Sequence, residues 1–369
     1  MQSIVPPRAR RAALLALGAA LSMLATLGGM DGASAAATST ASAAKTLVIS
    51  GAGDGHGVGM SQDGAYGYAQ HGWSDQQILA HYYTGTALGQ APANAVVKVL
   101  VGSKVQAIPL ERYVRGVVSA EMPAEWPLAA LEAQAIASRT YALTADAGGS
   151  RFDVYADTRS QVYLGKAAET ARTNSAISAT AGQIVTYAGK PAITYFYASS
   201  GGMTESVQNG FPGAEPEPWL QGVQDAYETS RSSWKVSLGF ATAAARLKGL
   251  VKGGFQGIEV LARGYSPRIL SAAVLGSGGS TTVSGPELEA RLGLQSTWAY
   301  FGVRTGAGAV APEPDRSGWK APPTQGAAPT PPATATAPTV APTTPTGVQG
   351  GSQAPGGGAS MKDGGVTAG

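Results

Sequence analysis

Only the middle of the chain has the apolar patterning that a folded core requires. Residues 305–369 are dominated by Gly, Pro, Ala and Thr, and they contain no apolar run with the period of a helix or a strand. Such a composition cannot bury enough apolar surface to offset the conformational entropy that folding removes. We therefore predict one folded domain over residues 45–304, followed by a disordered tail over residues 305–369.

The first 37 residues have the features of a secretory signal peptide. Arg8, Arg10 and Arg11 precede an apolar run over residues 12–27, and small residues follow at 33–37. This run is shorter than the about 20 apolar residues that span a membrane, which favours cleavage over a retained anchor. We expect a secreted protein with no stable transmembrane anchor after signal cleavage.

Charge and cysteine content narrow the function classes. The chain has 26 Lys and Arg against 23 Asp and Glu, a net charge of +3, and loss of the leader's three Arg and one Asp leaves +1. A nearly neutral chain offers no general attraction for nucleic acid, so we predict no nucleic-acid partner. The chain has no Cys, which excludes disulfides and thiolate metal sites. An exported chain without disulfides fits a bacterial cell surface.

Local patterns predict both helices and strands. Residues 46–50 and 96–101 are rich in β-branched residues and read as strands, while residues 127–143 (PLAALEAQAIASRTYAL) form a strong helical pattern. Residues 183–187 and 192–197 flank a turn and read as a hairpin. Further strands are predicted at 258–262 and 269–275, and a short helix at 286–292. Because helices and hairpins segregate, we predict an α+β fold with a mainly antiparallel sheet.

The glycine-rich stretch GDGHGVGMSQDGAYGYAQHGW, at residues 53–73, invites a nucleotide or metal interpretation. No register of its glycines matches positions 1, 3 and 6 of the dinucleotide fingerprint, and no phosphate-binding Gly-Lys-Ser/Thr follows. The three histidines are His56, His71 and His81, and these spacings match no local zinc-ligand pattern. We therefore predict no cofactor and no metal.

Glu121 is the strongest candidate for a catalytic residue. The stretch AEMPAEWP, at residues 120–127, places Glu121 where an apolar segment enters a Pro-rich turn just before the predicted helix. Burial raises the pKa of a carboxyl group, which suits a general acid. A carboxylate that only caps the start of the helix would occupy the same position.

Two further stretches place hydroxyl and amide groups beside aromatic residues. They are DTRSQVYLG at residues 157–165 and YFYASSGGMT at residues 195–204. Such surroundings are typical of a carbohydrate groove, although an ordinary strand end with its turn fits equally well. A nucleophilic Ser199 or Ser200 is disfavoured because the G-x-S-x-G elbow is missing.

Five stretches together resemble the SpoIID/LytB family of bacterial cell-wall proteins. They read GHGVGMSQDGAYGYAQHGWSDQQILAHYYTGT, LERYVRGVVSAEMPAEWPLAALEAQAIASRTYAL, DTRSQVYLG, FYASSGGMTES and SGPELEARLGLQSTW. The resemblance covers nearly the whole span from 46 to 304. It implies a fold around a glycan-binding cleft and a peptidoglycan-directed role, with glycan strands as the partner.

The resemblance also implies roles for particular residues. Sporulation members of the family resemble lytic transglycosylases that act on peptide-denuded glycan strands, and the family's catalytic glutamate falls on Glu121. The positions that match its substrate-binding motifs are His56, Gln62, Arg139, Gln161, Tyr163, Ser199 and Ser200. Zinc-bearing members use cysteines, which this chain lacks.

Two departures keep a second function open. The motif GHGVGMSQ comes first here, whereas in sporulation members it lies near the end of the domain. Asp54 and Asp63 stand where the family often has Trp, which weakens the expected stacking on sugars. The alternative to an enzyme is a noncatalytic glycan-binding protein that stimulates a cell-wall amidase. Either function implies a secreted, cell-wall-associated protein.

Overall fold

The structure is a computed structural model that describes residues 44–228 and 232–306, together with residues 308, 310–312, 317, 318 and 320. The predicted signal peptide lies outside the described residues, and so does most of the predicted tail. No helix in these described segments is long and apolar enough to cross a membrane.

The described chain builds two hydrophobic cores. One core draws on residues between Val58 and Leu220, and we call residues 52–228 the helical region. The other combines Leu47 and Ile49 with residues from Trp234 to Phe301, and we call residues 44–51 with 232–312 the β region. Helices and mostly antiparallel sheets occur together, which confirms the predicted α+β class.

Helix α4 is the centre of the helical region. It spans Leu128–Thr144, so the predicted helix at 127–143 is confirmed with ends shifted by one residue. Its alanine-rich sequence is buried on most sides, as expected of a helix without a continuous polar face. It contacts α1 (Gln62–Gln70), α2 (Asp75–Tyr82), α3 (Leu110–Glu121), α5 (Ala171–Ala179) and β7 (Gln183–Tyr187).

Short strands and one short helix complete the helical region. β2 (Met60–Ser61) pairs in parallel with β9 (Phe196–Tyr197). The other strands are β3 (Ala87–Gln90), β4 (Val96–Val101), β5 (Lys104–Pro109), β6 (Val154–Tyr155) and β8 (Lys190–Pro191), and the helix is α6 (Val207–Gly210). The predicted strand at 96–101 is therefore confirmed as β4.

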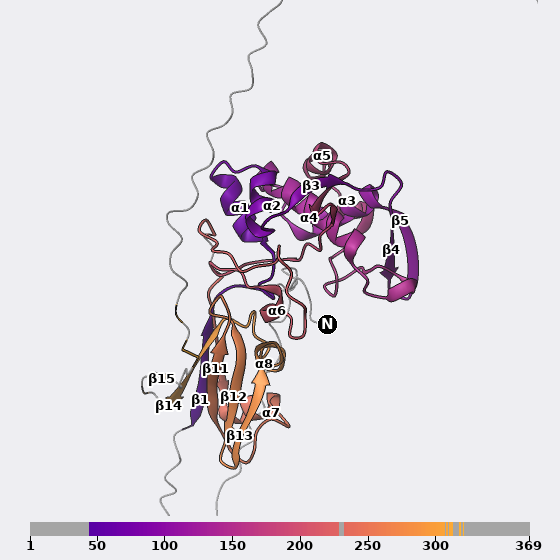
Figure 1. Ribbon diagram of the computed structural model, residues 1–369. Coiled ribbons are helices and arrows are strands. Elements are labelled where there is room, and N and C mark those ends of the chain that lie inside the picture. The colour runs from indigo at the N-terminus through magenta and orange to yellow at the C-terminus, as the bar shows by residue number, and fades with distance from the viewer. Residues whose placement is uncertain are drawn as a thin grey trace, which may run out of the picture. The chain divides into compact units, whose positions relative to one another are not determined.

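The β region is built around the first strand of the chain. β1 (Lys45–Gly51) lies between β10 (Trp234–Gly239) and β14 (Ala299–Thr305) and is antiparallel to both. Figure 1 shows this indigo strand among the orange strands of the C-terminal half.

The β region also contains a second antiparallel sheet, formed by β11 (Phe255–Arg263), β12 (Ile269–Gly276) and β13 (Gly279–Ser284). Two helices pack nearby, α7 (Phe240–Arg246) against β11 and α8 (Gly285–Leu292) against β12. These elements confirm the predicted strands at 46–50, 258–262 and 269–275 and the helix at 286–292.

The sheet continues past the domain end that the sequence predicted at residue 304. β14 ends at Thr305, and β15 (Val310–Pro312) pairs with it in antiparallel register. The ordered β region therefore reaches Pro312.

The predicted hairpin at 183–197 is wrong in its second strand. β7 does turn back through β8, and the Ala192 N–H donates to the Val185 carbonyl at 3.0 Å, but the predicted strand does not continue along β7 beyond Ala192. The chain then turns inward, because the Thr194 hydroxyl is fully buried and donates to the Ala137 carbonyl of α4 at 2.8 Å. Phe196 and Tyr197 pair instead with Met60 and Ser61.

Candidate active site

Glu121 is the last residue of α3 and is 8% exposed. Its Oε1 accepts a hydrogen bond from the Val162 backbone N–H at 2.8 Å, and its Oε2 accepts one from Nε2 of Gln62 at 3.2 Å. Burial raises the pKa of Glu121 to about 7, although both hydrogen bonds act in the opposite direction. A carboxyl group with this pKa exchanges its proton readily near neutral pH.

Glu121 does not cap the following helix. Helix α4 begins after Pro127 and has no side-chain hydrogen bond at its N-cap. The carboxylate oxygens of Glu121 face Gln62 and Val162 instead. The helix-cap interpretation of Glu121 is therefore wrong.

Gln62 and Gln161 belong to a buried set of amide and hydroxyl groups around Glu121. Nε2 of Gln62 lies 3.5 Å from Oε1 of Gln134, and Nε2 of Gln134 donates to the Ser138 hydroxyl at 2.9 Å. Nε2 of Gln161 donates to the Ser138 carbonyl at 3.1 Å. The structure thus brings two of the predicted site residues close to the carboxyl group.

His56 is held in the glycine-rich loop that leads from β1 to β2. Gly57 has a φ of +90°, and a Cβ there would lie 2.3 Å from Nε of Arg268. Gly59 has a φ of +78°, and a Cβ there would lie 2.1 Å from the Tyr195 carbonyl oxygen. Positive φ and these close approaches both require glycine. The loop therefore packs against Arg268, whose Nη1 donates to the Gly55 carbonyl at 2.8 Å.

The imidazole of His56 is neutral over the ordinary pH range. Burial lowers its pKa to about 3, and the positive charge of Arg268 acts in the same direction. Nδ1 of His56 accepts the Val58 backbone N–H at 3.0 Å. The ring lies beside Phe211 at 4.9 Å and Tyr195 at 6.1 Å between centroids.

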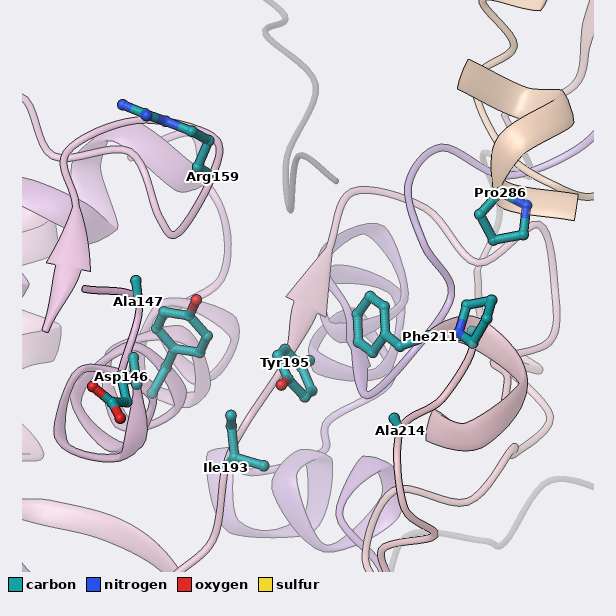
Figure 2. Close-up of a pocket in the computed structure, with 12 residues that line it drawn as sticks. Asp146, Ala147, Arg159, Ile193, Tyr195, Phe211, Ala214 and Pro286 are labelled. Atoms are coloured by element: carbon teal, nitrogen blue, oxygen red, sulfur yellow. The ribbon is translucent and has the colours of Figure 1, made fainter. Parts of the chain in front are cut away.

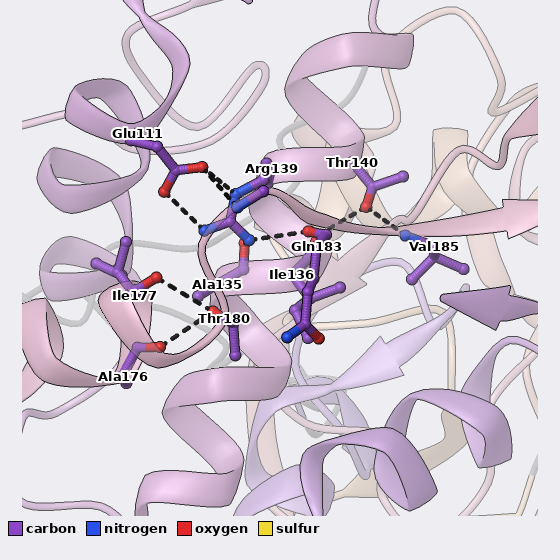
Figure 3. Close-up of polar contacts among 11 residues, drawn as sticks. Glu111, Ala135, Ile136, Arg139, Thr140, Ala176, Ile177, Thr180, Gln183 and Val185 are labelled. Carbon is purple, nitrogen blue, oxygen red and sulfur yellow. Dashed lines mark hydrogen bonds and ion pairs between the residues drawn. The ribbon is translucent and has the colours of Figure 1, made fainter. Parts of the chain in front are cut away.

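Arg139 is fully buried and is held by groups of the protein. Its Nε and Nη2 donate to the two carboxylate oxygens of Glu111 at 2.7 and 2.9 Å, and its Nη1 donates to the Gln183 carbonyl at 2.9 Å. Figure 3 shows this fork between α3 and α4. Tyr163 is half-buried, and its ring stacks on Tyr113 with centroids 5.2 Å apart.

Ser199 and Ser200 are also fully buried. Both hydroxyl groups donate to the carboxylate of Glu228, which also accepts the Ser61 hydroxyl at 2.9 Å. Asp225 lies beside them, and its Oδ2 accepts the Tyr82 hydroxyl at 2.8 Å.

Asp225 and Glu228 form a buried acid pair. The Ser200 Oγ lies 2.5 Å from an oxygen of Glu228 and 2.9 Å from an oxygen of Asp225. One hydroxyl proton can serve only one acceptor, so one carboxyl must carry a proton. Burial, and next the neighbouring Glu228, raise the pKa of Asp225 well above its usual value.

This pair predicts a pH-dependent stability. Because the folded state keeps the Asp225 proton longer than the unfolded state, the free energy of unfolding should fall as the pH rises above about 4. Asp225→Asn cannot titrate, and its amide N–H can donate to the Ser200 hydroxyl as the protonated acid would. We expect thermal melts from pH 5 to pH 8 to show a smaller loss of stability in the variant than in the wild type. Equal losses would contradict a shared proton at this pair.

A pocket of about 480 Å³ is lined by residues at the end of α4, before β9 and after α6. Figure 2 shows Asp146 and Ala147 on one side, Phe211 and Pro286 on the other, and Tyr195 between them. Tyr195 and Phe211 also contact His56. Tyr141 lines the pocket too, and its pKa is raised mainly by burial, with smaller effects from the charges of Tyr195 and Glu121. The aromatic wall of the pocket thus contacts His56, whereas neither Glu121 nor Gln62 is among the residues that line it.

The remaining histidines and the two unusual aspartates lie in other surroundings. His71 stacks on Tyr227 with centroids 4.0 Å apart, and His81 lies 3.0 Å from the Tyr68 hydroxyl. Asp54 and Asp63 make backbone hydrogen bonds to the segment before Ser200, and neither lines the pocket. Across the described residues, no three His, Asp or Glu side chains gather as a metal site.

Sequence reasoning missed Arg268, Asp225 and Glu228. Their partners are distant in sequence, since Arg268 donates to Gly55 across 213 positions and Ser61 donates to Glu228 across 167. Among the aromatic residues of the pocket, Tyr195 lies in the stretch at residues 195–204 that the sequence pattern indicated. Phe211 and Tyr141 lie outside the two stretches chosen for that pattern.

Parts of the chain are similar to stage II sporulation proteins. Residues 102–187 match a family model described as stage II sporulation protein, and this segment contains Glu121. Over 230 residues the chain is 29% identical to stage II sporulation protein D of Bacillus subtilis, a match that covers 57% of this chain and 65% of that protein.

Two shorter matches have higher identity. An uncharacterised protein of Brachyspira hyodysenteriae is 42% identical over 122 residues, 32% of this chain and 33% of that protein. The amidase enhancer of Bacillus subtilis is 39% identical over 92 residues, 25% of this chain and 12% of that protein. The chain thus spans about a third of the Brachyspira protein and just under two thirds of the sporulation protein.

Proposed function

Because the chain belongs to the SpoIID/LytB family, we propose that it acts on cell-wall peptidoglycan as a lytic transglycosylase that cleaves peptide-denuded glycan strands. The observation that carries this proposal is Glu121, a buried carboxyl group whose pKa is raised to about 7. A single group that must first give and then take a proton works best when its pKa is near the working pH.

The proposed reaction uses Glu121 twice. The protonated carboxyl gives its proton to the glycosidic oxygen as the bond from that oxygen to C1 of muramic acid breaks. The resulting carboxylate takes the proton of the muramic acid 6-hydroxyl, whose oxygen forms a new bond to C1. Glu121 ends protonated, as it began, and the product carries a 1,6-anhydro ring. Since the substrate supplies the nucleophile, the second carboxylate of ordinary glycosidases is unnecessary.

The burial of the other site residues suggests a division of roles. Arg139, Gln161, Ser199 and Ser200 have no exposed surface, so we propose that they fix the walls of the site. We assign glycan contacts to the half-buried ring of Tyr163 and to the aromatic wall of the pocket, formed by Tyr195 and Phe211. His56 would support the aromatic wall through its contacts with Tyr195 and Phe211, and Gln62 would act at Glu121. Aromatic rings of this kind stack on sugar faces.

We further propose that the protein works outside the cell. Residues 1–37 would be removed on export, residues 45–312 would form the active domain, and the tail would extend from it. The protein would then remain associated with the cell wall.

The test is an analysis of the products. The mature protein is incubated with peptide-free glycan strands and, separately, with intact peptidoglycan, and new chain ends are identified by mass spectrometry. We expect 1,6-anhydromuramic acid ends, with more product from the peptide-free strands. Reducing ends without the anhydro ring would identify a hydrolase and contradict the proposed reaction.

The match to the amidase enhancer favours a second candidate function. In that case the domain binds glycan without cleaving it and stimulates a cell-wall amidase. Peptide release by an amidase is measured with and without the Glu121→Gln variant. Stimulation by this variant, together with no cleavage by the wild type, would favour the enhancer function.

A further inference from the structure

Two hydrogen-bond donors hold the Glu121 carboxylate, and they differ in whether the donor can be replaced by an acceptor when its group rotates. The Val162 donor is a backbone N–H, so its polarity towards Oε1 is fixed. The Gln62 donor is a side-chain amide, whose nitrogen and oxygen exchange places when the group rotates by half a turn. If the Gln62 carbonyl faced Glu121, it would repel the ionised carboxylate and accept a hydrogen bond only from the protonated acid.

The surroundings of Gln62 select one of these two orientations. Oε1 of Gln134 lies 3.5 Å from Nε2 of Gln62 and can accept its second N–H. Gln134 is itself oriented, because its Nε2 donates to the Ser138 hydroxyl, one helical turn further along α4, at 2.9 Å. Gln134 and Ser138 have no exposed surface, and Gln62 is 2% exposed.

We propose that Gln134 is a positioning residue that acts through Gln62, so that an N–H and not a carbonyl oxygen faces Glu121. This inference rests on the proposed function, in which Glu121 is the acid/base. Gln134 does not line the pocket, and the donors to the Glu121 carboxylate are Gln62 and Val162. Its effect is to favour the ionised form of Glu121 and to offset part of the effect of burial.

The ionisable groups around Glu121 do not compete with this effect near neutral pH. Tyr113, on the same helix, and Tyr141, on α4, are the tyrosines whose pKa the charge of Glu121 affects. Burial raises the pKa of Tyr113 well above its usual value and that of Tyr141 to about 12. Both stay neutral where Glu121 titrates. Helix α1 contributes the Gln62 amide, and the loop after β6 contributes the Val162 N–H.

The experiment follows the Glu121 carboxyl by carbon-13 NMR in full-length mature protein, with Glu121→Gln used to assign the signal. Gln134→Met keeps the size of the side chain and removes the oxygen that orients Gln62. We expect the titration midpoint of Glu121 to rise by about one pH unit, a tenfold change in proton affinity. The pH optimum of glycan cleavage should move up with it, while KM stays the same.

Thr140→Val is the matched control. It removes a buried hydroxyl from the same helix, because Thr140 accepts the Val185 N–H at 2.9 Å and donates to the Ile136 carbonyl at 2.7 Å, away from Glu121. Its Glu121 midpoint should stay at the wild-type value. If Gln134→Met does not fold, Ser138→Ala removes the partner that orients Gln134 and should shift the midpoint in the same direction by less.

The outcomes separate this inference from the proposed function. An unchanged Glu121 midpoint in the folded Gln134 or Ser138 variant overturns the positioning role, whether or not the wild type cleaves glycan. A raised midpoint in a protein that cleaves no glycan supports the positioning role and overturns the transglycosylase activity. An equal shift in Thr140→Val would assign the effect to general loosening of α4 and also overturn the inference.

Discussion

Glu121→Gln should lower the rate of glycan cleavage by about 10²–10⁴-fold, the usual contribution of a general acid/base. Glutamine keeps the size of the side chain and can still accept the Val162 N–H, but it cannot give and recover a proton. Binding of the glycan should persist, because the aromatic wall of the pocket is unchanged. Rates are measured on peptide-free strands, and binding by sedimentation with the same strands.

Glu125→Gln is the control for this variant. Glu125 is exposed and lies in the same connection between α3 and α4, so it tests for a general loss of acidic charge. It should keep most of the activity. Cleavage by Glu121→Gln at the wild-type rate would remove the central residue of the proposed mechanism.

Glu111→Gln should lower the free energy of unfolding by about 2–4 kcal/mol. It removes the charge that pairs with Arg139, whose guanidinium is fully buried, and an uncompensated buried charge is costly. The lower end of this range is expected if water reaches Glu111, whose side chain is 40% exposed. Urea unfolding followed by circular dichroism measures the change.

Asp157→Asn is the matched control for a broken ion pair. The side chains of Arg159 and Asp157 are 51% and 52% exposed, so this pair should contribute less than about 1 kcal/mol. The double variant Glu111→Leu/Arg139→Met removes both charges and should recover part of the stability lost by Glu111→Gln. A loss below 1 kcal/mol in Glu111→Gln would mean that Arg139 is solvated, and a direct contact with substrate would then be the better role for it.

The elements that the sequence predicted correctly are those whose patterns are local. The alanine-rich run of α4 and the β-branched run of β4 are each sufficient to specify a helix and a strand. Helix α3 was not predicted, because Val114, Val117 and Val118 are β-branched and favour strands when read alone. Packing of its amphipathic face against α4 and α5 outweighs that preference.

The start and middle of helix α1 were not predicted, for a different reason. Its Gly64 and Gly67 disfavour a helix by their intrinsic propensity. A Cβ at Gly64 would lie 2.0 Å from the Tyr82 hydroxyl, and one at Gly67 would lie 1.9 Å from the Tyr227 carbonyl oxygen. These glycines allow neighbouring segments to approach the helix closely, and only the tertiary structure reveals that need.

In the candidate site, too, some features could be predicted from the local sequence and others could not. Glu121 could be predicted because its burial follows from the apolar residues just before it. The internal partners of Ser199, Ser200 and Arg139 could not, because Glu228 and Glu111 carry no local signal of their contacts. The motifs therefore did not show whether the side chains of their polar residues face a ligand or the protein interior.

Strand β1 is the first described element to be synthesised, and both strands that pair with it follow the whole helical region. The Trp234 indole donates to the Gly53 carbonyl at 3.0 Å, a contact that joins positions 181 residues apart. Leu47 and Ile49 cannot be covered by β10 and β14 before those strands have been made. The helical region draws its core from residues between Val58 and Leu220 and so can fold first. The β region therefore closes last, because β1 has no partner in the nascent chain until β10 has been made and its sheet gains the second neighbour only with β14.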